Sequence, residues 1–213
     1  MIAVGAVAVH RIVVGPWAEN CYVASADGGD AIVIDPGGNA EQIAEHIAAN
    51  RLRVHAVLAT HGHPDHVSSL AEVTKLYGIP FGIHPDESGA LRRINFYRFA
   101  IHRLGPVEVP PIDLDLATAT ILRFGALEVS VVHTPGHSPG SVCLQIGDNL
   151  FTGDTLVATH AGNAELPGFD RMALKASVDR LAQAYPPDMV VRPGHGRSVS
   201  LGEATARMSV TRA

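Results

Sequence analysis

Three histidines and one aspartate lie within six residues of the segment THGHPDH, at His61, His63, Asp65 and His66. Each of these side chains can bind a transition metal, histidine through a ring nitrogen and aspartate through a carboxylate oxygen. Without a metal, the cluster would be a set of partly charged groups that are costly to bury. A solvated loop does not explain this density, so the segment predicts a metal site.

Three later segments share one pattern, an apolar strand followed by a turn that carries a metal-binding residue. VSVVHTPGH ends at His137, NLFTGD ends at Asp154 and MVVRPGH ends at His195. Each turn contains a glycine, which lets the backbone bend tightly beside a site: Gly136, Gly153 and Gly194. Strand ends of one rigid scaffold can converge at one edge, so we expect the segments to meet at a single site.

The candidate ligands number seven: His61, His63, Asp65, His66, His137, Asp154 and His195. Five imidazoles and two carboxylates suit zinc or iron, which accept both nitrogen and oxygen. One ion takes three or four protein ligands, so seven imply two ions that share a carboxylate. Two ions roughly 3.5 Å apart would hold a hydroxide between them. We therefore predict two divalent metal ions, with Zn²⁺ favoured and Fe or Mn as alternatives.

The composition narrows the class of protein. The chain has 213 residues, 46% of them hydrophobic, and a net charge of −5 with neutral histidine. We interpret residues 1–213 as one domain. No run of Lys and Arg marks a nucleic-acid binder, and no apolar segment is long enough to span a bilayer. The apolar start lacks the basic residues of a signal peptide. We expect a cytoplasmic protein with a small-molecule substrate and neither nucleic acid nor membrane as partner; the oligomeric state is left open.

The two halves of the chain must supply the strands that position the ligands. In the first half we expect strands over 6–14, 21–24, 31–35 and 54–60, and helices over 40–50, capped by Asn39, and 66–78. In the second half we expect strands over 127–134, 141–147, 150–153 and 189–194, and a helix over 170–185. The middle is less regular, with a helix over 90–104 and an extended stretch over 105–116. The pattern predicts an α/β fold of two packed sheets with helices outside.

The ligand segments, in the order THGHPDH, HTPGHSPGSVCL, FTGDTL and VVRPGHG, resemble the metallo-β-lactamase superfamily, and within it the short glyoxalase II-like hydrolases. Weaker similarity in AENCYV and AIVIDPGG extends the resemblance over nearly the whole chain. The resemblance implies a four-layer αβ/βα sandwich with a dinuclear site. In that site the first metal would take His61, His63 and His137, the second would take Asp65, His66 and His195, and Asp154 would bridge them.

The resemblance also implies a reaction. A bound metal lowers the pKa of water from 15.7 to about 7, which supplies hydroxide without a serine or cysteine nucleophile, and it stabilises the oxyanion. Asp65 could direct the hydroxide proton as well as bind metal. The substrate class implied is S-acyl thioesters such as S-lactoylglutathione. Alternatives are a persulfide dioxygenase with one iron, a lactonase or β-lactamase, and a metal-binding module without catalysis.

Two features depart from the family pattern. The chain ends at Ala213, without room for the helical domain that helps longer relatives bind glutathione, and Asn163 stands where the family usually has a basic residue. We therefore expect glutathione to be a poor thiol carrier. The segment RRINFYRF, from Arg92 to Phe99, either offers charge and aromatic surface to a substrate or is a helix with its aromatics in the core.

Several other polar residues receive weaker interpretations. Asp35 either orients a metal ligand or caps a turn. His84, His133 and His160 are expected to be structural histidines, and Cys21 and Cys143 small buried thiols.

Overall fold

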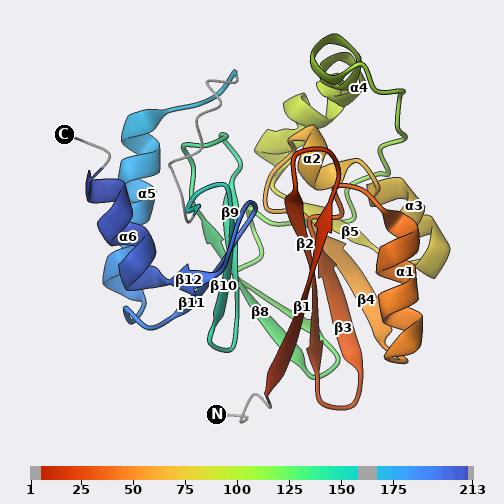
Figure 1. Ribbon diagram of the computed structural model, residues 1–213, viewed down its shortest axis with the longest axis horizontal. Helices are drawn as coiled ribbons and strands as arrows, with labels where there is room; N and C mark the ends of the chain where they lie inside the picture. The colour runs from red at the N-terminus through yellow and green to blue at the C-terminus, as the bar shows by residue number, and fades with distance from the viewer. Residues whose placement is uncertain (1–5, 158–166, 211–213) are drawn as a thin grey trace.

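Each half of the chain forms one six-stranded sheet, and the two sheets pack face to face (Figure 1). The computed structural model describes residues 6–157 and 167–210. The first sheet has the order β1-β2-β3-β4-β5-β6, and the second has the order β12-β11-β10-β9-β8-β7. Each half of the chain supplies one of the two predicted sheets, and sequence order is kept within each sheet.

The first sheet contains both antiparallel and parallel strands. Its members are β1 (Val7–Val14), β2 (Glu19–Ala26), β3 (Asp30–Ile34), β4 (Arg53–Leu58), β5 (Phe81–Ile83) and β6 (Leu114–Asp115). The pairs β1–β2 and β2–β3 are antiparallel, and the pairs from β3 to β6 are parallel. The strands β3 and β5 are buried along their whole length, which explains why both are apolar apart from Asp30 at the start of β3.

The second sheet is antiparallel except for one pair. Its members are β7 (Ile121–Phe124), β8 (Leu127–His133), β9 (Val142–Ile146), β10 (Asn149–Gly153), β11 (Val190–Pro193) and β12 (Val199–Ser200). The parallel pair is β10–β11, so both strands end at the same edge of the sheet. The two residues that follow these ends, Asp154 and the nearby His195, are thereby brought to one edge.

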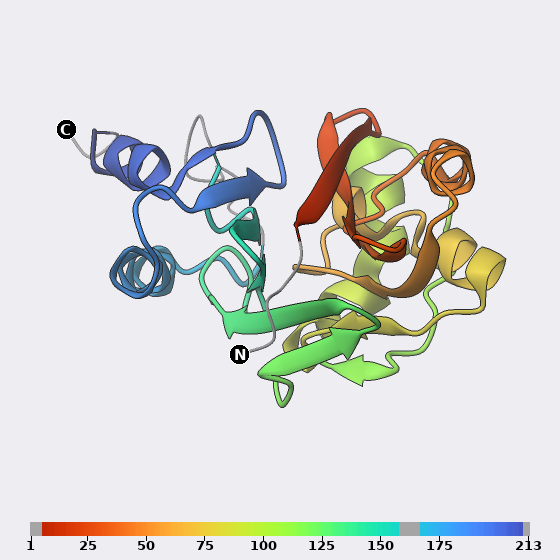
Figure 2. The same cartoon turned by 90° about the horizontal axis from the view of Figure 1, so that it is seen from below.

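Helices cover the outer face of each sheet (Figures 1 and 2). The first sheet is covered by α1 (Ala40–Ala49) and α3 (Leu70–Tyr77), and the second by α5 (Arg171–Ala184) and α6 (Leu201–Val210). The predicted four-layer αβ/βα arrangement is confirmed. The central layer of the core joins residues of both sheets, including Tyr22, Ile34 and Leu58 from the first and Leu144 and Phe151 from the second.

The helix expected over 66–78 is two helices, α2 (Pro64–Val67) and α3, so that prediction was wrong in its boundaries. The break falls at Ser68 and Ser69, where Ser69 N donates to Pro36 O at 2.9 Å. This long-range bond replaces one within the helix. Asn39 also differs from expectation: it precedes α1 with φ 54° and its side chain makes no capping bond.

Several elements were not expected, namely β5, β7, β12 and α6, and three of them are strands of two to four residues. Both cysteines are buried and free, as predicted. Among the described residues, none of the helices combines the length and the hydropathy that a bilayer-spanning helix needs.

Candidate metal centre

The structure brings the ligand segments together at one edge of the two sheets. His61 and His63 follow β4, and Asp65 and His66 lie on α2. The remaining candidates follow β8, β10 and β11 in the second sheet: His137, Asp154 and His195. Among these candidates, ligand atoms lie within 4.8 Å of one another in a first group, His61 with His63 and His137, and in a second group, Asp65 with His66 and His195. A third set, His61 with His66 and Asp154, meets the same limit and joins the two groups.

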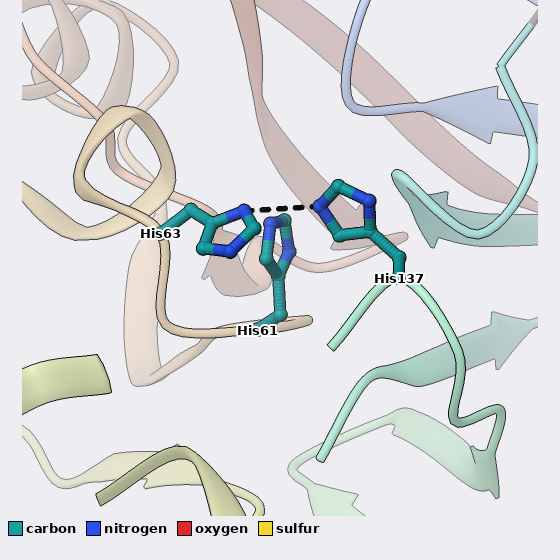
Figure 3. Close-up of side chains that lie close together, drawn as sticks. All are labelled: His61, His63 and His137. Carbon is teal, nitrogen blue, oxygen red and sulfur yellow. Dashed lines mark hydrogen bonds between the residues drawn. The ribbon is translucent and has the colours of Figure 1, made fainter. Parts of the chain in front are cut away.

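In the first group, three imidazoles point toward one another from two loops (Figure 3). His63 Nδ1 lies 3.0 Å from His137 Nε2, and the His61 ring centroid lies 4.6 Å from that of His63. Burial lowers the pKa of His61 well below its usual range, and neighbouring histidines lower it further. Burial also lowers the pKa of His63, and it lowers that of His137 to about 4. The rings are therefore neutral at neutral pH, the form that binds metal.

The second group combines a carboxylate with two imidazoles. Asp65 Oδ2 lies 3.2 Å from His195 Nε2 and 3.9 Å from His66 Nε2. Burial alone would lower the pKa of His66, but the surrounding carboxylates, Asp65 foremost, outweigh it and raise the pKa well above its usual range. Burial alone would raise the pKa of Asp65, but His66 and His195 hold it well below its usual range. The carboxylates around His66 thus stabilise a positive charge within the second group. A bound metal ion could supply that charge in place of the protonated His66.

Asp154 faces both groups. Its Oδ2 lies 3.6 Å from His137 Nε2 in the first group and 3.7 Å from His195 Nε2 in the second. Its Oδ1 lies 3.6 Å from His66 Nε2. A carboxylate in this position could contact two ions at once.

The donor atoms fit transition-metal ions. Within the described part of the chain, His61 Nε2, His66 Nε2 and Asp154 Oδ1 are buried without a hydrogen-bond partner, which is costly unless another group satisfies them. Two ligands bound to one ion at about 2.0–2.2 Å are roughly 3–3.5 Å apart. The donor atoms of His63 and His137 are 3.0 Å apart and those of Asp65 and His66 are 3.9 Å apart, so small movements would accommodate an ion.

Asp35 orients a candidate ligand. Its Oδ2 lies 3.0 Å from His66 Nδ1, and its two oxygens also accept bonds from Thr60 N and Thr60 Oγ1, both at 2.7 Å. An ionised carboxylate accepts hydrogen bonds but cannot donate one. His66 therefore donates from Nδ1, which leaves its Nε2 to face the candidate centre. Of the two interpretations of Asp35, the structure supports the orienting one.

Glu19 is a buried carboxyl that the sequence interpretation missed. Its Oε1 lies 3.6 Å from His66 Nδ1, and neither oxygen has a hydrogen-bond partner among the described residues. Burial raises the pKa of Glu19 well above its usual range, which favours its neutral form. Its only signal in the sequence is its place at the start of AENCYV.

The same segment holds the loop that carries His195. Asn20 Nδ2 donates to Pro193 O at 2.8 Å and to Gly196 O at 2.9 Å, and Tyr22 Oη donates to Pro193 O at 2.8 Å. The loop passes so close to the centre that a Cβ on Gly194 would lie 2.4 Å from Asp154 Oδ1. Glycine is therefore required at position 194.

Helix α4 (Ser88–His102) confirms the helix expected over 90–104 but corrects one interpretation of its aromatics. Phe96 and Phe99 are 67% and 65% exposed, so these aromatic side chains are not in the core. The α4 side chains that are buried in the core are Leu91 and Ile94. Arg92 and Arg93, the first two bases of RRINFYRF, are also exposed. The third base, Arg98, bonds Gly105 O at 2.8 Å and Ser68 Oγ, which fixes α4 beside α2.

His84 and His133 stack with ring centroids 4.3 Å apart. His133 Nε2 donates to Pro139 O at 2.9 Å, and His84 Nδ1 accepts from Asp86 N at 3.2 Å. These contacts tie both rings to the fold, but their ring nitrogens also lie within 4.8 Å of a carboxylate oxygen of Asp86, so the structural role expected for both stays a prediction. His160 and Asn163 lie outside the described residues.

Comparison with known proteins adds relatives of the whole chain. An uncharacterised protein of Aquifex aeolicus is 37% identical over 93% of this chain and 94% of its own length. A Bacillus subtilis protein named "Probable metallo-hydrolase YqgX" is 31% identical over 88% of this chain and 89% of its own. The hydroxyacylglutathione hydrolase GloC of Haemophilus influenzae is 27% identical over 92% of this chain and 93% of its own.

Solved structures share the fold. The B3 metallo-β-lactamase BLEG-1 is 30% identical with a TM-score of 0.89, covering 97% of this chain and 100% of that one. The di-iron-bound form of TTHA1623 is 31% identical with a TM-score of 0.83, covering 94% of this chain and 99% of that one. The predicted fold class is thereby confirmed. Since the family model of the metallo-β-lactamase superfamily also matches residues 14–195, this chain belongs to that superfamily.

Proposed function

We propose that this protein is a hydrolase of S-acyl thioesters that uses two metal ions. The observation that carries the proposal is the position of Asp154, which faces two adjacent groups of metal-binding side chains. A relative named hydroxyacylglutathione hydrolase supports thioester cleavage. A neighbouring structure named as di-iron-bound supports a pair of ions, and it keeps iron beside zinc as a candidate metal.

We assign each ligand as the sequence resemblance implies. His61, His63 and His137 would bind the first ion; Asp65, His66 and His195 would bind the second; and Asp154 would contact both. The bound pair would supply a nucleophile from water at neutral pH and positive charge for the developing oxyanion.

The protein's own residues supply orientation and proton control. Asp65 stays ionised because His66 and His195 hold its pKa low, so its oxygens could accept a hydrogen bond from a water at the centre and direct its proton. Asp35 fixes the direction of the His66 ring. The exposed Phe96 and Phe99 of α4 would supply apolar surface to the acyl or thiol part of the substrate.

We also propose that glutathione is a poor thiol carrier. Asn163 stands where the family usually has Lys or Arg, and a neutral amide makes no ion pair with a carboxylate. Arg98 is already bonded to Gly105 and Ser68, which leaves Arg92 and Arg93 as the exposed bases of α4 that could substitute. A lost charge-assisted contact costs about 1.5–3 kcal/mol and should mainly raise KM, because the thiol tail is remote from the reacting carbonyl.

A second candidate function is β-lactam hydrolysis. The observation that favours it is the 30% identity and TM-score of 0.89 to a B3 metallo-β-lactamase. Both reactions attack a carbonyl and could use the same metal ligands, so the substrate assay decides between them.

The experiment combines metal analysis with a substrate panel. Protein from metal-replete growth is analysed for bound metals and assayed with thioesters of several thiols, a β-lactam, and a persulfide with O₂ uptake recorded. We expect about two ions per chain and preferential hydrolysis of a thioester other than S-lactoylglutathione. A single iron with O₂ uptake would favour the persulfide dioxygenase, and preferential β-lactam cleavage would favour the second candidate.

Asn163→Arg should lower KM for S-lactoylglutathione, and unchanged kinetics would contradict the role given to Asn163.

A further inference from the structure

A buried glutamate joins two loops that lie far apart in the sequence. Glu87, the last residue of the 3₁₀ helix η1 (Pro85–Glu87), is 1% exposed. Its Oε2 accepts a hydrogen bond from Gly62 N at 2.8 Å, and its Oε1 accepts one from Gly140 N at 2.7 Å. Because each oxygen binds a different loop, the length of this one side chain sets the distance between them.

Both loops carry ligands of the first group. Gly62 lies between His61 and His63, and Gly140 lies three residues after His137. We propose that Glu87 is a positioning residue that holds these loops at the spacing the first metal requires, before the metal binds. Glu87 has no place in the ligand groups described above; both of its hydrogen bonds go to loop backbone, and its charge also acts on His63.

The packing around Glu87 makes the link tight. A Cβ on Gly62 would lie 3.0 Å from Glu87 Oε2, and a Cβ on Gly140 would lie 2.9 Å from Glu87 Cγ. The second loop is held at the adjacent residue as well, since His133 Nε2 donates to Pro139 O at 2.9 Å. A shift of the Glu87 carboxylate would therefore move loop backbone rather than a flexible side chain.

A purely structural role for Glu87 predicts a different result from a positioning role. If Glu87 only stabilised the start of α4, its replacement would lower the stability of the fold but leave metal affinity unchanged in folded molecules. If it positions the loops, folded molecules should bind the first ion more weakly. The inference rests on the proposed metal centre but not on the thioester reaction.

The test is Glu87→Gln, which keeps the size of the side chain but replaces one acceptor oxygen with an NH₂ group. Stepwise Zn²⁺ dissociation constants are measured on metal-free protein by competition with a chelator. We expect one constant to weaken about 10- to 100-fold, the usual effect of losing a partner that orients metal ligands, and the other to change little.

The matched control is Asp30→Asn. Asp30 is also a buried carboxylate that accepts a backbone N–H bond, from Ala126 N at 2.9 Å, but it belongs to neither ligand group. Its replacement should lower thermal stability and leave both zinc constants near the wild-type values. Unchanged zinc constants in folded Glu87→Gln would overturn the proposal, and absence of zinc binding by the wild type would overturn both this role and the metal centre.

A measurement on the wild type covers the case in which Glu87→Gln does not fold. The amides of Gly62 and Gly140 should exchange slowly with solvent in the metal-free protein, because both are bonded to Glu87. Exchange at the rate of unprotected amides would contradict preset loops.

Discussion

Asp35 Oδ2 lies 3.0 Å from His66 Nδ1, and both side chains are buried. The contact leaves His66 Nε2 free to face Asp154 Oδ1, 3.6 Å away. The conformation of Asp35 itself, with φ 52°, is one that few residues other than glycine adopt. A carboxylate held in this way restricts the ring to one orientation and one tautomer.

Asp35→Asn should therefore weaken metal binding in the second ligand group. An asparagine keeps the size of the side chain but lacks the charge and one of the two acceptor oxygens. We expect a loss of about 10- to 100-fold in affinity for one ion, measured by chelator competition. If both ions bind as tightly as in the wild type, the orienting role of Asp35 is wrong.

Asp154→Ala should remove more activity than His195→Ala, because Asp154 faces both ligand groups and His195 belongs to one. Loss of an orienting partner alone costs about 10- to 100-fold, so we expect the loss of Asp154 to exceed about 100-fold in kcat/KM. Metal content should be measured on the same samples. Retention of both ions and of near wild-type turnover by Asp154→Ala would exclude a bridging role.

Metal removal should destabilise the wild-type protein more than it destabilises the Asp154→Ala variant. A ligand that binds only the folded state at 100 times its Kd stabilises that state by about 2.7 kcal/mol. The difference in unfolding temperature between samples with zinc and samples with chelator should thus be clear for the wild type and much smaller for the variant. Equal shifts in both proteins would place zinc elsewhere than at Asp154.

The sequence predicted the strands that carry ligands because each is a strongly apolar run followed by a turn, a purely local signal. It could not predict contacts between distant segments. Glu87 binds Gly140 across 53 residues, and Ser69 N bonds Pro36 O, which breaks the expected helix over 66–78. Strands as short as β12 carry too few residues for a pattern.

Asp30, at the start of β3 in the first sheet, makes another long-range contact, with the turn between β7 and β8 in the second sheet. His55 Nε2 lies 2.6 Å from its Oδ1, Ala126 N donates to its Oδ2 at 2.9 Å, and Arg53 Nε donates to its Oδ1 at 2.8 Å. These bonds hold the pKa of Asp30 well below its usual range. A carboxyl whose pKa is lower in the folded than in the unfolded state stabilises the fold at pH values above its unfolded pKa, which is about 3.9 for Asp. This stabilisation is lost as the pH falls from there toward the pKa of the folded state.

Asp30→Asn should therefore lower the free energy of unfolding by about 1.5–3 kcal/mol at pH 7, the value of a hydrogen bond to a charged group. The difference between variant and wild type should shrink below about pH 4, where the unfolded wild type becomes protonated. Denaturant unfolding at a series of pH values measures it. A difference that stays constant across the series would show that the charge of Asp30 contributes nothing.

If catalysis needs two metal ions held by the two ligand groups, activity should follow the zinc occupancy of both groups. Metal-free protein is titrated with Zn²⁺ while the initial rate of thioester hydrolysis is recorded. We expect the rate to rise until about two equivalents per chain are bound and then to stay constant. A rate that reaches its maximum at one equivalent, or no thioester hydrolysis at any zinc concentration, would contradict the proposed dinuclear centre.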